Sequence, residues 1–253
     1  MFDITAIPAF KDNYIWALHN ARQLVVVDPG DAQPVLDFLR ITGLTLTAIL
    51  CTHRHHDHIG GIANLRAVYN VPVYGQRHPH NPAITHHLSE GDTLTLPEFD
   101  LRFDIFAVPG HLDDHLAYVA PGILFCGDVL FGAGCGRNFE GTVRQLQQSL
   151  QRLARLPDDT RVYCAHEYTL ANLRFALACE PDNAAIAQRI LATQALRDAH
   201  RPSLPSTIAL EKATNPFLRC NQATVIHTLQ QRGLEDSSET GVFMALRQWR
   251  NGF

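Results

Sequence analysis

The segment THRHHDHIGG, from Thr52 to Gly61, places four histidines and an aspartate between His53 and His58. Neutral imidazole is a preferred ligand of zinc and iron, and a carboxylate adds the negative charge that a cation needs. The segment directly follows the apolar run LTAILCT, which is typical of a buried strand. In an extended chain residues i and i+2 point the same way, so His53 and His55 should converge, while Asp57 and His58 face a second point. Two metal positions are therefore implied.

Three further strand-like runs end on a residue type that binds metals: FDIFAVPGH on His111, ILFCGD on Asp128 and RVYCAH on His166. Each residue alone is ambiguous, because a histidine after a strand often bonds a backbone carbonyl and Gly-Asp often forms a turn. Their joint occurrence favours a two-metal centre over a solvated histidine-rich loop. Two dications about 3.5 Å apart repel unless an anionic oxygen lies between them, so such a centre needs a bridging carboxylate.

Elements that could position these residues follow from the apolar patterns. Short strand-like runs occur in LVVVDPG, LTAILCT, VPVYG, DTLTLP, FDLRFDIFAVPG, ILFCGD and RVYCAH, and helical patterns follow Asp31 and Ile59. From about Glu167 onward the pattern is almost entirely helical, with a proline-marked break at PSLPST and a last helix through FMALRQWR. We expect two closely packed domains, residues 1–167 and 168–253, the first of mixed α/β class and the second all-helical.

Composition limits the kinds of partner. The chain has 253 residues, 46% hydrophobic, and a formal net charge of −4, which gives no basic field for nucleic acid. No apolar run approaches the roughly 20 residues that span a bilayer. The six cysteines form no C-x-x-C pair and are expected to be reduced, several as small buried hydrophobes. We expect a cytoplasmic monomer that acts on a small molecule, with no nucleic-acid or membrane partner.

The histidine segment resembles the H-x-H-x-D-H motif of the metallo-β-lactamase superfamily. This resemblance implies an αββα sandwich with a two-metal site at the edge of its sheets, followed here by the smaller helical domain. It also implies the ligand assignment: one metal would be held by His53, His55 and His111, the other by Asp57, His58 and His166, and Asp128 would bridge them.

Four stretches resemble glyoxalase II, the hydroxyacylglutathione hydrolases: DNYIW (12–16), GCGRNFEGT (134–142), CAHEYTLANLRFA (164–176) and TNPFLR (214–219). The resemblance covers nearly the whole chain. Glutathione carries carboxylates that an arginine fork can accept in bidentate geometry, and a tyrosine hydroxyl can bond its peptide. In that family the glutathione moiety is held by groups that match Arg137, Phe139, Tyr168, Arg247 and Arg250.

The reaction that this resemblance implies is hydrolysis of S-D-lactoylglutathione to glutathione and D-lactate, the second step of methylglyoxal detoxification. Two metals lower the pKa of a bridging water to about neutral, which supplies hydroxide as the nucleophile. Asp57 and Asp128 are the expected catalytic carboxylates, with Asp57 holding the hydroxide in line. The thiol leaves readily as thiolate. Cys51 ends an apolar strand and is expected to pack rather than react.

The remaining histidines have other expected roles. His56 should point away from the metals, and His115 should orient other groups rather than bind. His78, His80, His86 and His87 lie in a proline-rich segment that we expect to be an exposed loop.

The chain also departs from the family pattern. The family reads G-H-T-x-G-H where this chain has GHLDDH, so Leu112 and Asp114 replace threonine and glycine. Asn251 replaces a common acidic residue, and STIALEK lacks a usual glycine. These changes bear on metal preference and substrate fit more than on hydrolysis.

Two classes of alternative remain open. One is another enzyme on the same fold, a lactonase or a glutathione-persulfide dioxygenase with a single iron; the second ligand set, Asp57 and His58, argues against it. The other is a non-catalytic metal-binding protein, but ligands dispersed over more than a hundred positions suit a preorganised catalytic site. Zinc is the expected metal, and iron or manganese also suits these ligands.

Overall fold

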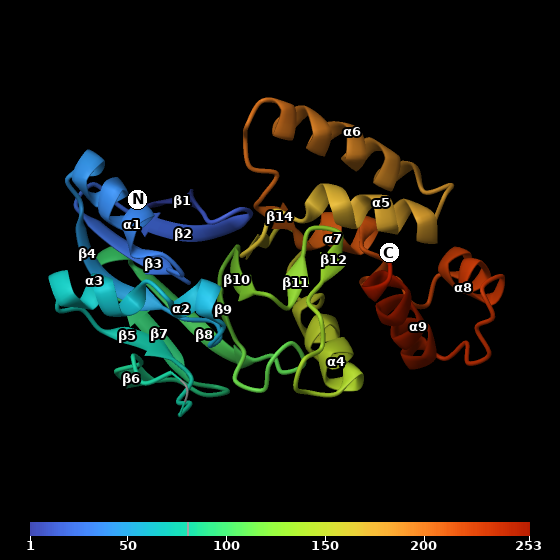
Figure 1. The fold of residues 1–253 in the computed structure, drawn as a ribbon, viewed down its shortest axis with the longest axis horizontal. Coiled ribbons are helices and arrows are strands. Elements are labelled where there is room, and N and C mark those ends of the chain that lie inside the picture. Colours follow the sequence, from blue (N-terminus) through green and yellow to red (C-terminus); the bar gives the residue numbers. More distant parts are fainter. Residues whose placement is uncertain (80) are drawn as a thin grey trace. The chain divides into compact units, whose positions relative to one another are not determined.

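The computed structural model describes residues 1–79 and 81–253, and the prediction for His80 lies outside the described residues. The chain divides into two compact units. Unit 1 comprises residues 1–108 and 114–127, and unit 2 comprises residues 109–113 and 128–253. Figure 1 labels the elements of both. The predicted domain boundary between residues 167 and 168 stays a prediction.

Unit 1 contains a mixed sheet in which β1 to β6 follow one another in chain order. The first three strands are antiparallel, and β3, β4, β5 and β6 run parallel to one another. The continuous apolar runs of β3 and β4 suit strands that are buried on both faces. The bounds are β1 Asp3–Ala9, β2 Asn13–His19, β3 Gln23–Val27, β4 Thr45–Leu50, β5 Val73–Gly75 and β6 His86–His87.

The second group of strands in unit 1 is an antiparallel meander of β7 (Thr93–Leu96), β8 (Leu101–Ala107), β9 (Leu116–Ala120) and β10 (Ile123–Gly127). Its buried Tyr118 donates through its hydroxyl to Cys51 O at 2.8 Å, just after β4, and to Tyr74 O at 3.2 Å, within β5. The two groups of strands therefore face each other. A short 3₁₀ helix, Pro97–Phe99, links β7 to β8.

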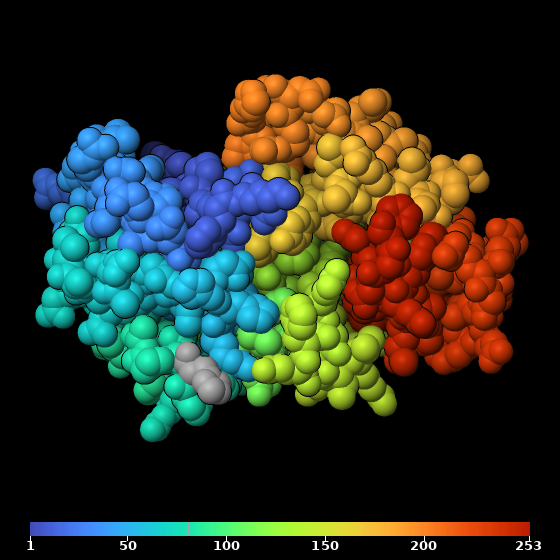
Figure 2. All heavy atoms as spheres, in the orientation of Figure 1, coloured from blue at the N-terminus to red at the C-terminus, as the bar shows by residue number. Residues whose placement is uncertain are grey.

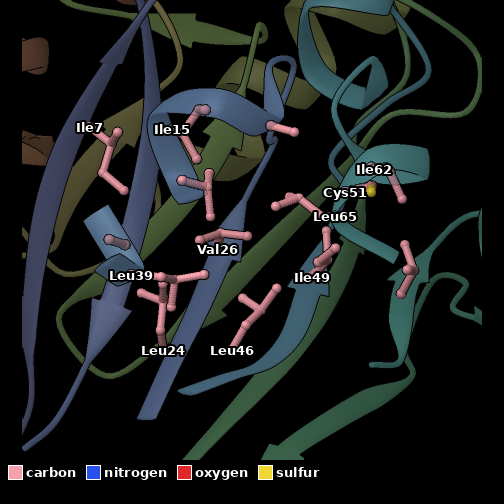
Figure 3. Packing of buried hydrophobic residues seen from close by; sticks show 14 of the residues in the cluster. Ile7, Ile15, Leu24, Val26, Leu39, Leu46, Ile49, Cys51, Ile62 and Leu65 are labelled. Atoms are coloured by element: carbon pink, nitrogen blue, oxygen red, sulfur yellow. The ribbon is translucent and has the colours of Figure 1, made fainter. Parts of the chain in front are cut away.

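Helices α1 (Ala32–Thr42) and α3 (Ile62–Val68) cover the outer face of the mixed sheet. Their apolar sides contribute Leu39 and Leu65 to a core that also holds Leu24, Val26 and Ile49 (Figure 3). Asp31 caps α1 through a bond from Gln33 N, and Gly43 ends it in the left-handed conformation at φ 71°. Between β4 and α3 lies the four-residue α2 (His56–Ile59).

Unit 2 begins its regular structure with the hairpin β11 (Leu130–Phe131) and β12 (Gly134–Cys135). Helix α4 (Val143–Leu153) starts with a capping box between Thr142 and Gln145. Strand β13 (Arg161–Cys164) pairs with β14 (Ser206–Thr207). The helices that follow are α5 Thr169–Cys179, α6 Ala184–Asp198, α7 Ile208–Thr214, α8 Ala223–Gln230 and α9 Glu239–Asn251, with a 3₁₀ helix at Pro216–Leu218.

Aromatic side chains pack the helices of unit 2 together. Phe175 contacts Phe217 and Trp249 at ring distances of 6.0 and 5.0 Å, and Phe243 contacts Phe217 at 5.5 Å. Helices α8 and α9 lie side by side, and their surfaces meet in the red region of Figure 2.

The predicted elements are confirmed with two corrections. All seven strand-like runs form strands, and the regular elements after Glu167 are helices apart from the two residues of β14. His86 and His87 are exposed as expected, but they form β6 rather than loop. The sequence patterns did not indicate β1, β2, β9, β11 or β12. No helix within the described part of the chain combines the length and apolarity that crossing a bilayer requires.

Candidate active site

The histidine segment leaves the end of β4 and turns into α2. His53 is 2% exposed, and its Nε2 lies 3.1 Å from Nδ1 of His55. Their rings meet edge to face at 4.8 Å. His56 is exposed and is the first residue of α2. His53 and His55 therefore converge within unit 1, in the way that the i, i+2 spacing predicts.

Asp57 and His58 lie in the first turn of α2. The Oδ2 atom of Asp57 is 3.5 Å from Nε2 of His58. This same oxygen accepts a hydrogen bond of 2.9 Å from Nδ2 of Asn13, a buried residue at the start of β2. Asn13 belongs to the DNYIW stretch, so this contact gives that stretch a physical role: it fixes the Asp57 carboxylate.

Asp28 is a candidate site residue that the sequence patterns did not single out. Its carboxylate accepts bonds from Thr52 N and Thr52 Oγ1, both at 2.7 Å, and lies 3.0 Å from Nδ1 of His58. A carboxylate partner requires Nδ1 to carry a hydrogen, which leaves Nε2 of His58 as the ligand atom. The signal was present, because Asp28 ends the run LVVVD just as Asp128 ends ILFCGD.

A second buried layer lies behind His53. The ring of His115 is fully buried and stacks on His53 at 4.6 Å and 15°. Beside it, Arg54 Nη1 donates to Asp114 Oδ1 at 2.7 Å, with the two side chains 11% and 3% exposed. Asp114, one of the departures from the family pattern, thus has a cationic partner within the histidine segment.

The Cys51 thiol is buried at the end of β4. Burial raises its pKa well above the ordinary value, and the negative charges of Asp28 and Asp114 raise it further. The thiol therefore stays protonated at neutral pH and is a poor nucleophile. This confirms the expectation that Cys51 is a packing residue.

In unit 2, the imidazoles of His111 and His166 both face the carboxylate of Asp128. Nε2 of His111 is 3.6 Å from Asp128 Oδ2, and Nε2 of His166 is 3.4 Å from Asp128 Oδ1. All three residues are at most 6% exposed. The two carboxylate oxygens face different imidazoles, a disposition that suits a carboxylate shared by two cations. Ligand atoms about 2.0–2.2 Å from one ion are commonly separated by such distances.

Backbone geometry fixes His111 in place. Its Nδ1 lies 2.8 Å from the carbonyl oxygen of Arg137, so Nε2 is the atom left for a metal. Gly136 has to be glycine, because a Cβ there would meet Asp128 O at 2.0 Å and His111 Nδ1 at 2.9 Å. Gly110 adopts φ 137°, and a Cβ would meet the backbone of Leu146 in α4 at 2.5 Å.

A cavity of about 370 Å³ opens beside these candidate ligands in unit 2. His111 and Asp128 form part of its wall. The structure brings all five predicted glutathione-binding residues to its lining: Arg137, Phe139, Tyr168, Arg247 and Arg250. The Tyr168 ring stacks on His166 at 4.7 Å and 4°, and the Phe139 ring meets His111 edge to face at 5.2 Å.

The cavity is strongly cationic. Arg247 is 5% exposed and donates to Cys135 O and Gly136 O, while its Nε has no partner among the described residues. No carboxylate in the described part of the chain pairs with Arg137, Arg247 or Arg250. Burial lowers the pKa of Arg250, and the positive charges of Arg247 and Arg137 lower it further. Asn251, where the family often has an acid, accepts from Arg247 without neutralising it. The arrangement suits an anionic ligand.

The fold and the donors define a class of protein. Residues 10–166 match the model of the metallo-beta-lactamase superfamily, and residues 167–253 match that of the hydroxyacylglutathione hydrolase C-terminus. The chain therefore has the metallo-β-lactamase fold with a carboxyl-terminal helical region. Its histidines and aspartates fit a divalent metal, because neutral imidazole and carboxylate are suitable donors and the second nitrogens of His58 and His111 already have acceptors.

Curated relatives identify the family. A hydroxyacylglutathione hydrolase of Nitrosomonas eutropha is 49% identical over 254 residues, and one of Dechloromonas aromatica is 51% identical over 270 residues, each covering 100% of both chains. The chain thus belongs to the hydroxyacylglutathione hydrolase family. Among solved structures, ETHE1 from Myxococcus xanthus has a TM-score of 0.66 at 26% identity, covering 98% of both chains. A di-iron-bound form of TTHA1623 has a TM-score of 0.60 at 26% identity, covering 85% of this chain and 100% of the other.

Proposed function

We propose that this enzyme hydrolyses the thioester of S-2-hydroxyacylglutathione, with S-D-lactoylglutathione yielding glutathione and D-lactate, as the second step of methylglyoxal detoxification. The observation that carries the proposal is the cationic cavity of unit 2, which has three arginines on its wall and ends at His111 and Asp128. Membership of the hydroxyacylglutathione hydrolase family supports the same reaction.

The glutathione moiety is assigned to this cavity. Arg247 and Arg250 accept its carboxylates, Arg137 adds a third positive charge, and the Tyr168 hydroxyl bonds its peptide. Phe139 is 59% exposed and covers the apolar part of the ligand. The thioester carbonyl then lies toward His111 and Asp128, because both belong to the wall of the same cavity.

The proposed metal centre would hold two divalent ions. Zinc is the expected metal, and iron and manganese are the alternatives. His53, His55 and His111 would hold one ion, Asp57, His58 and His166 would hold the other, and the Asp128 carboxylate would be shared by both. The donor chemistry supports this assignment, since neutral imidazole and carboxylate are suitable ligands of a divalent ion. When bound, the ions supply a hydroxide nucleophile at neutral pH and a Lewis acid for the thioester carbonyl.

The side chains of the chain supply orientation. Asp57, fixed by Asn13 at 2.9 Å, accepts a hydrogen bond from the attacking water and aligns it with the carbonyl carbon. Asp28 and the carbonyl of Arg137 hold His58 and His111 with Nε2 directed outward. The departing thiolate requires no protein acid, because a thiol with a pKa of about 8.5 is a good leaving group.

The experiment that tests the proposal follows the thioester absorbance of S-D-lactoylglutathione with purified enzyme. A parallel measurement of oxygen consumption with glutathione persulfide separates hydrolysis from the dioxygenase alternative. Thioester loss without oxygen uptake is the expected result, and oxygen uptake without thioester loss would refute hydrolysis. Elemental analysis of protein purified without added metal identifies the ions and their number.

A further inference from the structure

The hairpin β11–β12 carries one side of the cavity. Phe131, Cys135 and Gly136 all belong to its lining. Phe131 also meets the rings of His166 and Tyr168 at 5.8 and 5.3 Å. The turn of the hairpin contains Ala133 at φ 55°, a left-handed conformation that is unfavourable for a residue with a side chain. The hairpin therefore needs outside support to keep its shape.

A carboxylate from α7 provides this support. Ala133 N donates to Oε2 of Glu211 at 2.8 Å. Nδ2 of Asn215 donates to the same oxygen at 3.1 Å and to Gly134 O at 2.9 Å. Glu211 and Asn215 thus hold both the strained turn and the strand that follows it. Both residues are fully buried, so water does not replace these bonds.

The Glu211 carboxylate is held in turn by a buried cation from α6. Arg189 Nη2 donates to Oε1 at 2.6 Å, and its Nη1 donates to Thr214 Oγ1 at 2.5 Å. Arg189 also bonds Ser206 Oγ at 3.0 Å, on β14. An ion pair at this depth is costly to bury unless nearly every polar atom is bonded, as here. A hydrophobic pair would pack these helices as well, but it would leave Ala133 N without an acceptor and would remove one of the acceptors of Asn215 Nδ2.

We propose that the buried pair Glu211–Arg189 is a positioning device that fixes the β11–β12 hairpin, so that the carbonyls of Cys135 and Gly136 hold Arg247 at the cavity. Arg247 Nη1 donates to these carbonyls at 3.0 and 3.2 Å, so a shift of the hairpin displaces the guanidinium. Thr214 and Asn215 are the first two residues of the TNPFLR stretch. In this proposal they support ligand binding through the hairpin, without touching the ligand. The inference rests on the proposed glutathione cavity.

The test measures glutathione binding to the protein as purified by titration calorimetry, which reports on the cavity without catalytic turnover. Glu211→Gln keeps the size of the side chain and removes its charge. We expect its dissociation constant for glutathione to rise about fivefold or more, because the charge-assisted bonds that hold the hairpin are weakened.

The matched control is Glu180→Gln. Glu180 is also a buried carboxylate of unit 2, bound by Arg219 through Nε at 2.6 Å and Nη2 at 2.9 Å, and it lies outside the cavity lining. Glu180→Gln should lower the thermal midpoint as Glu211→Gln does, yet leave glutathione affinity within about twofold. Equal losses of affinity in both variants, or none in Glu211→Gln, would overturn the inference.

Arg189→Lys and Arg189→Met provide a second pair, which also serves if Glu211→Gln does not fold. Lysine keeps a positive charge for Glu211 and should restore part of the affinity that methionine loses. In steady-state assays of the metal-loaded enzyme, Arg189→Met should raise KM with little change in kcat, as expected for a residue that acts through ligand binding. A fall in kcat alone would contradict the positioning role. If the wild-type protein does not bind glutathione, the proposed function itself fails.

Discussion

Asp57 is fixed by a residue far from it in the sequence. Asn13, 44 positions earlier, donates to the Asp57 oxygen that also lies 3.5 Å from His58 Nε2. A neutral amide donor orients a carboxylate without competing for its charge. The orientation of ligands by such outer contacts commonly accounts for a large part of metal affinity.

Asn13→Ala should therefore lower the affinity for the metal about 10- to 100-fold. Competition with a chromophoric chelator measures the change on the protein without substrate. Asn20→Ala is the control, since Asn20 bonds Gln23 and Glu98 O at the other end of β2. An Asn13→Ala protein with wild-type metal affinity would show that Asp57 needs no such support.

Arg54 and Asp114 form a buried salt bridge that the sequence alone did not indicate. Removing one member of a buried ion pair leaves the other charge buried without a partner, which costs about 3–5 kcal/mol of stability. Replacing both members by apolar residues often changes the stability very little. Arg54→Met and Asp114→Leu should each lower the free energy of unfolding by about that amount, and the double variant should recover most of the loss. Urea unfolding of the metal-free protein measures all three.

The control for this cycle is the exposed pair Arg40–Asp37 on α1, at 3.2 Å with side chains 75% and 46% exposed. Its loss should cost only about 0.2–1 kcal/mol. Additive effects of Arg54→Met and Asp114→Leu would mean that the two charges are not coupled.

At the scale of elements, the position of His111 depends on the fit of a loop against a helix. Gly110 lies so close to α4 that a Cβ would meet three atoms of Leu146 within 2.6 Å, two of them backbone. Because the helix backbone cannot yield as a flexible side chain does, Gly110→Ala has to displace the loop and with it His111. Overpacking of this kind costs about 1–3 kcal/mol beyond any backbone strain.

Gly122→Ala is the matched comparison, because Gly122 has φ 74° but nothing within 4 Å of the added carbon. It should cost only the strain of the left-handed conformation, about 1–2 kcal/mol, and leave metal content unchanged. Gly110→Ala should lower both thermal stability and metal content, as measured by calorimetry and elemental analysis. Full metal content in Gly110→Ala would show that the loop adapts without moving His111.

The same elements show what the sequence could predict. Alternating and apolar runs predicted the strands that carry His53, Asp128 and His166, because the residues that decide a strand are adjacent in the chain. The contacts of Asp28 with Thr52, of Asn13 with Asp57 and of Arg54 with Asp114 were missed because the partners lie 24 to 60 positions apart. Glu211 contacts Ala133 across 78 positions. Such contacts depend on the packing of whole elements, which local patterns do not encode.

At the scale of the whole molecule, charge is distributed unevenly. The chain has a formal charge of −4, yet the cavity of unit 2 gathers Arg137, Arg247 and Arg250 without an acidic partner among the described residues. A glutathione thioester carries two carboxylates and one ammonium group, so it is a net anion. The net negative charge of the protein repels this anion at long range. The attraction of the anion to the arginines of the cavity therefore acts only over the last few ångströms.

Binding should therefore weaken with salt while the chemical step does not. Raising the ionic strength from about 0.05 to 0.5 M shortens the Debye length from roughly 14 to 4 Å, so KM should rise several-fold with kcat nearly constant. Arg250→Gln should reduce this salt dependence, because Arg250 is half-buried in the cavity and its charge is not neutralised there. Arg232→Gln should leave it unchanged, since Arg232 is exposed over Trp249 and lies outside the cavity. Screening by salt weakens the attraction of a charge for an incoming anion far more than it disturbs bonds already buried within the protein. A KM that is independent of salt would therefore mean that the arginines organise the cavity without binding the carboxylates of the substrate.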